Sequence, residues 1–74
     1  MDATLALQAL AAIIADEPLR DRFLALTGYD AATLRARAAE PDMAAAIAEF
    51  LSGHEPDLLA IADRLGVKPG ELTA

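Results

Sequence analysis

Residues 3–15 read ATLALQALAAIIA, and this stretch decides the fold class. Alanine and leucine favour helix more than most residues do, and no glycine or proline interrupts the stretch. Only Thr4 and Gln8 are polar, so the predicted helix is apolar nearly all round. A helix of that kind is normally covered on all sides by other parts of the protein. We therefore predict a helix over residues 3–15, with Asp2 as its N-cap, at the centre of a helical bundle.

The same helix has a second apolar side, because Leu5 lies roughly opposite Ile14 on a helical wheel. If the other helices leave this side open, it is an exposed apolar patch, and such patches usually mark sites for partners. The interface candidates on this side are Leu5, Ala9 and Ala12. Enclosure within the bundle and exposure to a partner are the two alternatives for this helix.

Proline and glycine divide the rest of the chain into further helices. Three Glu-Pro dipeptides place proline at a first helical position, where its missing N–H costs no hydrogen bond, and Asp30 is a further expected N-cap. Gly28, Gly53 and Gly66 stand where helices should stop, because glycine adopts the left-handed conformation without strain. The predicted helices cover residues 3–15, 18–27, 31–39, 41–51 and 56–65, with a short last turn at residues 69–73. The sequence thus predicts an all-α fold, a compact bundle of about five short helices, in which residues 1–74 form a single helical domain.

Apolar residues recur at helical spacing in each predicted helix and supply the core candidates. The third helix is the weakest, since it offers only one leucine with two alanines. The core candidates are Leu7, Leu10, Ile13, Ile14, Leu19, Phe23, Leu26, Ala31, Leu34, Ala38, Met43, Ile47, Phe50, Leu51, Leu58, Ile61, Ala62 and Leu65.

The size and composition of the chain leave little margin for stability. A chain of 74 residues buries only about 60% of the surface that its unfolded form exposes. The sequence contains no cysteine, so no disulfide or thiolate-bound metal can reinforce the core. A bundle of this size therefore depends on tight helix packing, on self-association or on a partner protein.

Charge and hydropathy bear on where the protein acts and on what it binds. The net charge is −6, with twelve acidic residues against six basic ones, and phosphate backbones and anionic membranes repel such a chain. The apolar opening stretch lacks the basic start of a signal peptide and is shorter than the roughly 20 residues of a membrane span. We expect a cytoplasmic protein with no membrane contact. A local positive patch could form from Arg22, Arg35 and Arg37. Ordinary ion pairs with neighbouring carboxylates would account for these arginines equally well.

Few residues in the chain could carry catalysis. The only histidine, His54, and the only serine, Ser52, lie two residues apart at a predicted helix end, where contact between them is not assured. His54 follows Gly53, where a cation would favour the dipole at the end of the preceding helix. All four glycines are isolated, so the chain has no glycine-rich phosphate-binding loop. We expect no enzymatic activity, catalytic residue, cofactor, metal site or small-molecule ligand.

Residues 58–67, LLAIADRLGV, suggest an alternative function. Ala62 stands four residues before Gly66, and Val67 follows the glycine. This arrangement matches a DNA-binding helix-turn-helix hairpin, in which the alanine lets two helices cross closely. Only Lys68 is basic in the segment that would have to read DNA. The hairpin is therefore expected to be packing geometry, and nucleic-acid binding stays as the alternative.

Several motifs carry a resemblance to a known family. The most distinctive is RFLALTG at residues 22–28, followed by Asp30 and then by Leu34-Arg35. Further motifs are Ala39-Glu40-Pro41, AIAEFL at residues 46–51, and Glu55 followed by Leu58-Leu59. Over nearly its whole length the chain resembles a family of short alphaproteobacterial proteins, the domain of unknown function 3572. The resemblance implies a small cytoplasmic helical protein with no assigned activity, cofactor or catalytic residue.

The chain departs from this family at Met43-Ala44-Ala45, where bulkier apolar residues are expected. The packing of the fourth helix is therefore expected to be thinner. This expectation concerns packing alone, because the family supplies no functional residue that could be carried over.

The function that these features favour is a protein-interaction or homo-oligomerisation module. The two-sided first helix and the thin core carry this hypothesis, with Leu5, Ala9 and Ala12 as the candidate interface. The partner would be another protein or a second copy of the chain in a homodimer. Nucleic-acid binding through the C-terminal hairpin is disfavoured by charge.

Overall fold

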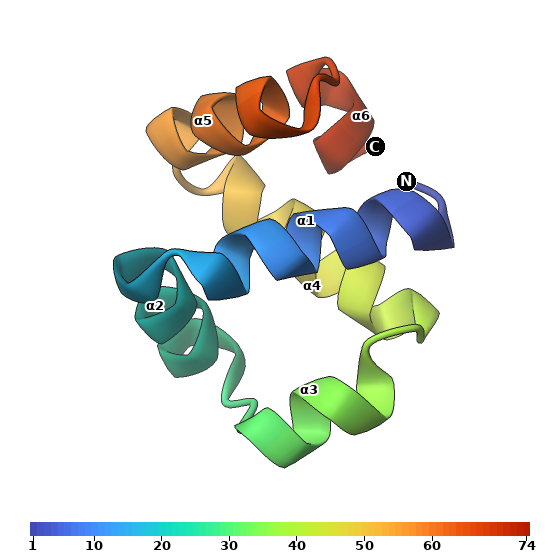
Figure 1. The fold of residues 1–74 in the computed structure, drawn as a ribbon, viewed down its shortest axis with the longest axis vertical. Coiled ribbons are helices and arrows are strands. Elements are labelled where there is room, and N and C mark those ends of the chain that lie inside the picture. The colour runs from blue at the N-terminus through green and yellow to red at the C-terminus, as the bar shows by residue number, and fades with distance from the viewer.

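Six helices and no strand make up the computed structural model, which describes residues 1–74 (Figure 1). The helices are α1 (Ala3–Ala15), α2 (Glu17–Thr27), α3 (Ala31–Arg37), α4 (Pro41–Ser52), α5 (Glu55–Leu65) and α6 (Pro69–Thr73). The predicted all-α fold is confirmed, and the short last turn is present as α6. None of the six helices has both the length and the apolar character that crossing a bilayer would require.

Aspartates begin three of the helices: Asp2 and Asp30 are the predicted N-caps, and Asp16, which was not predicted as one, caps α2. The side chains of Asp2, Asp16 and Asp30 each accept a hydrogen bond from the backbone N–H three residues later, at 2.7, 3.2 and 2.7 Å. Each carboxylate thereby satisfies one of the N–H groups that have no partner within the helix, and its charge complements the helix dipole.

Two of the three expected glycine stops are left-handed. Gly28 has a φ of 75° and Gly66 a φ of 69°. Gly53, which we also expected to be left-handed, has a φ of −79° instead. There the chain ends α4 by tightening its last turn, and the Gly53 N–H donates to the carbonyls of Glu49 and Phe50. The glycine is therefore not required at position 53 for its backbone conformation.

Helix α1 crosses the middle of the molecule and contacts α2, α4, α5 and α6 (Figure 1). Most of its inward-facing side chains are alanines, which let the neighbouring helices approach closely. The buried core cluster consists of Ala9, Leu10, Ala12, Ile13, Leu19, Phe23, Met43, Ile47, Phe50, Leu51, Ile61, Ala62 and Leu72. Met43 is fully buried in spite of the small residues that follow it, so α4 is anchored in the core at this position.

The prediction that α1 is enclosed on all sides is wrong. Leu7 is 43% exposed, and Ala11 and Ala15 are also exposed. The reason lies in α3, which makes no extensive contact with any other helix and so leaves this side of α1 uncovered. Among the other core candidates, Leu26 is 71% exposed and Ala31 is exposed.

Candidate interaction surface

The three predicted interface residues do not form an exposed surface. Ala9 and Ala12 are buried members of the core cluster, and Leu5 is half-buried and packs against that cluster. Arg64 of α5 reaches over this side of α1 and donates a hydrogen bond to the carbonyl of Ala12 at 3.5 Å. The correction has a simple cause: Ala9 and Ala12 lie on the same side of α1 as the buried Leu10 and Ile13, and their small side chains let the neighbouring helices pack closely there.

The exposed apolar surface lies on the other side of α1, where it faces α3. Between the two helices runs a groove of about 530 Å³. Eight of its nine lining residues are hydrophobic, and the ninth is an arginine. The lining residues are Leu7, Leu10, Ala11, Ile14, Ala15, Ala31, Leu34, Arg35 and Ala38. Contiguous apolar surface of this kind on a small domain usually marks a site for a partner.

Helix α3 forms the second wall of the groove and is the least tightly held helix in the molecule. It contains no buried residue, and Figure 1 shows it set apart from α1, with connecting segments leading to α2 and α4. Leu34 and the neighbouring Ala38 are half-buried and provide its contact with the core. Because so few apolar contacts hold α3, it is the element that can move at the lowest cost in free energy.

Asp30 stabilises the N-terminal end of α3. Its carboxylate accepts a hydrogen bond from the backbone N–H of Thr33 at 2.7 Å. Hydrogen bonding to Thr33 lowers the pKa of Asp30 from its ordinary value of 3.8. The carboxylate is therefore charged at neutral pH and complements the dipole of α3.

The one charged side chain that lines the groove, Arg35, is positive, whereas the chain as a whole is acidic. Arg35 and Arg37 are the only charged residues within α1 and α3, and neither forms an ion pair. Arg22, the third arginine of the patch that the sequence suggests, lies elsewhere. It pairs with Asp57 of α5, and its guanidinium carbon is 5.7 Å from the centre of the Phe50 ring. The positive patch is therefore limited to the two arginines of α3.

A family model described as Protein of unknown function (DUF3572) matches residues 2–74. The chain belongs to this family. The resemblance that begins at the motif RFLALTG is thereby confirmed. No curated protein matches the chain, and no solved structure does.

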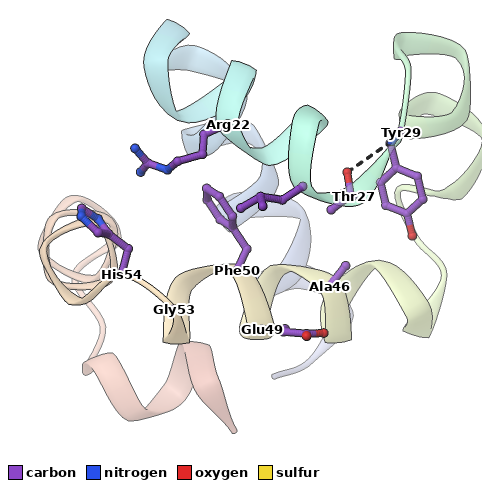
Figure 2. A pocket seen from close by; sticks show the side chains of 9 residues that line it. Arg22, Thr27, Tyr29, Ala46, Glu49, Phe50, Gly53 and His54 are labelled. Atoms are coloured by element: carbon purple, nitrogen blue, oxygen red, sulfur yellow. Dashed lines mark hydrogen bonds between the residues drawn. The ribbon is translucent and has the colours of Figure 1, made fainter.

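The RFLALTG motif of this DUF3572 chain has a structural role. Phe23 is fully buried, Gly28 ends α2 in the left-handed conformation, and the hydroxyl of Thr27 donates to the Phe23 carbonyl at 2.7 Å. The same hydroxyl accepts a hydrogen bond from the N–H of Tyr29 at 3.3 Å (Figure 2). The motif thus closes α2 and turns the chain towards α3.

A second pocket of the DUF3572 chain, of about 650 Å³, lies between α2 and α4 (Figure 2). Its volume is in the range of small-molecule sites. Two of its polar side chains, however, already contact Asp57, which does not line the pocket: Arg22 pairs with the Asp57 carboxylate, and His54 Nδ1 is 2.8 Å from an oxygen of that carboxylate. These contacts tie α2 to the start of α5. The lining residues are Arg22, Leu26, Thr27, Tyr29, Ala46, Glu49, Phe50, Gly53 and His54.

The two residues examined for catalysis bond to separate partners. The hydroxyl of Ser52 donates to the Ala48 carbonyl at 2.7 Å, whereas His54 is the N-cap residue of α5 and faces Asp57. His54 therefore serves the start of α5, not the end of α4 as its position after Gly53 suggested. No three His, Asp or Glu side chains lie close enough together to hold a metal ion.

The C-terminal hairpin has the predicted turn but not a helix suited to reading DNA. The Val67 N–H donates to the Ala62 carbonyl at 3.0 Å, and Ala62 is buried where the helices meet. Helix α6 is only five residues long, and its Leu72 is fully buried in the core. The side chain of Glu71 accepts a hydrogen bond from the N–H of Lys68 at 2.7 Å. The second helix thus fills the core, which weakens the nucleic-acid alternative.

Proposed function

We propose that this chain is a protein-interaction module and that its binding site is the groove between α1 and α3. The observation that carries the proposal is a nearly continuous apolar lining that the monomer leaves exposed, with Leu7 at its surface. Apolar grooves between helices commonly bind the apolar face of a partner helix. Movement of the weakly held α3 would allow the groove to fit its occupant.

Charge and the size of the groove favour a different protein over a second copy as the occupant, since two copies that each carry a charge of −6 repel each other. A stable interface takes about 800 Å² and 20 to 30 residues from each partner. The groove has nine lining residues, so it is too small to support a homodimer alone but can receive the side chains of one helix. The absence of cysteine is compatible with a cytoplasmic location for this module.

Site-specific photo-crosslinking tests this proposal. A photoreactive amino acid replaces Leu7, which lines the groove, or Leu59, which is 48% exposed on α5 and lies outside the groove. After irradiation in cells of the source organism, mass spectrometry identifies the crosslinked peptides. We expect position 7 to give an adduct with one defined segment of another protein, and position 59 not to give that adduct.

Three results would count against the proposal. Equal adducts at both positions would indicate collisions instead of a specific site. Adducts of the chain with itself would identify a second copy as the occupant. No adduct at position 7 would mean that the groove is empty in the cell.

A further inference from the structure

The charges around the groove indicate the chemistry of its occupant. Within α1 and α3 the only charged side chains are Arg35 and Arg37, although the chain as a whole carries a charge of −6. The three carboxylates at the starts of α1, α2 and α3 are engaged as N-caps, and Glu40 is not among the residues that line the groove. Arg35 is therefore the only charged side chain that lines the groove, while the capping carboxylates Asp16 and Asp30 adjoin its lining at Ala15 and Ala31.

The two arginines stand on either side of the apolar face of α3. Each residue of a helix turns by about 100°, so Arg35 and Arg37 point about 200° apart, with Leu34 and Ala38 between them. Arg35 lines the groove, and Arg37 lies beyond the opposite edge of this face. A helix that covers Leu34 would thus meet an unpaired guanidinium at the groove edge.

An unpaired guanidinium beside an apolar surface favours a carboxylate as its partner. Its planar N–H donors match the two oxygens of a carboxylate. Arg20 and Arg22 already pair with Asp21 and Asp57, which leaves the α3 arginines free for a partner.

We infer that the groove binds an amphipathic helix whose apolar face is flanked by glutamate or aspartate, positioned to pair with Arg35. The inference rests on the function proposed above and adds the charge of the partner to it. A second copy of the chain fits this description less well. In a second copy, the exposed leucine that lies between acidic residues is Leu59, with Glu55 and Asp63 on either side. This leucine is a single anchor, whereas helices that bind in grooves present several apolar anchors at helical spacing.

Three synthetic helical peptides test the inference on the full chain. All three are labelled with a fluorophore. Two of them share the same leucine face, which is flanked by glutamate in one peptide and by lysine in the other. The third peptide has the glutamate flanks but carries serine in place of each leucine. Fluorescence anisotropy measures the affinities, and amide chemical shifts of the isotope-labelled chain locate the binding site. The net charge of −6 by itself favours the lysine peptide, so the test opposes local to global electrostatics.

We expect the glutamate peptide to bind about tenfold more tightly than the lysine peptide at low salt, with a smaller difference at high salt. Its binding should shift the amides of Leu7 and Leu34, and the serine peptide should not bind. Arg35→Glu should reverse the order of the two leucine peptides. Arg20→Glu makes the same change in net charge on α2, outside the groove, and should preserve the order.

The outcomes separate this inference from the function on which it rests. If both leucine peptides shift the groove amides but the lysine peptide binds equally or more tightly, the groove binds helices and the acidic flank is wrong. The acidic flank is also wrong if Arg35→Glu leaves the order unchanged. If no peptide shifts the groove amides, the inference and the proposed function both fail.

Discussion

The Phe23 ring lies at the centre of the core, where it is fully buried. It meets Phe50 edge to face, with ring centres 5.1 Å apart, and lies 6.4 Å from the ring of Tyr29. Leu26, three residues later in the same helix and the same family motif, is 71% exposed and borders an open pocket. The two residues are equally apolar in the sequence, but their contributions to stability should differ greatly.

We expect Phe23→Ala to lower the free energy of unfolding by about 3–5 kcal/mol, because it removes a buried ring and leaves a cavity. The free energy of unfolding of native proteins is typically about 5–15 kcal/mol, so this loss would remove a large part of it, and about all of it at the lower end of the range. Leu26→Ala should change the same free energy by no more than about 0.5 kcal/mol. Urea denaturation followed by circular dichroism measures both values. Similar losses for the two variants would mean that the core is centred elsewhere.

Helix α3 is the helix that is least firmly attached to the core. Half-buried Leu34 and Ala38 attach it to the core, and Asp30 caps its start. Local opening is easiest where few apolar contacts must be broken. The helical order of α3 should therefore depend on its N-cap more strongly than the order of the other helices depends on theirs. Because α3 forms one wall of the groove, the shape of the groove should depend on this cap as well.

The lowered pKa of Asp30 gives α3 a dependence on pH. The folded state has the lower pKa, so the stabilisation by the charged cap is fully present above the ordinary value of 3.8 and is lost as the pH falls below it. We expect the helical Cα chemical shifts of residues 31–37 to decrease over that range. The Asp30 carboxyl shift, followed in the same spectra, should titrate below 3.8.

Asn in place of Asp30 provides the control, since asparagine also caps helices but does not titrate. In Asp30→Asn the loss of α3 below 3.8 should be weaker than in the unmodified chain. Asp30→Ala should loosen α3 at all pH values, seen as faster amide hydrogen exchange in residues 31–37. An identical acid transition in all three proteins would assign the effect to other carboxylates.

The exposed surface and the net charge of the whole molecule bear on its oligomeric state. Its 4350 Å² is close to the value expected for a compact protein of 7.7 kDa, and its charge of −6 makes two copies repel each other. Light scattering coupled to size-exclusion chromatography should therefore give a mass near 7.7 kDa at both low and high protein concentration. A mass of twice that value would require a self-complementary interface and would reassign the groove to a second copy.

Local features of the sequence determined most of the helices. Alanine-rich stretches, aspartate caps, Glu-Pro starts and glycine stops act over one turn of chain, so the bounds of α1, α2, α4 and α5 could be read without tertiary information. The family could also be recognised, since its motif RFLALTG is continuous in the chain. Leu72 was missed as a core residue because a five-residue helix with one large apolar side chain shows no periodicity.

Only the tertiary structure decided which side of α1 is buried. The sequence predicts Leu5, Ala9 and Ala12 as an interface on the second apolar side of α1. Because α1 is apolar nearly all round, its own sequence does not indicate which side faces the core. The choice depends on where the other helices pack: α2, α4, α5 and α6 contact the side that carries Leu10 and Ile13, where small alanines permit close approach. The groove lined by Leu7 and Leu34 results from that choice, because α3 packs too loosely to cover the side that remains.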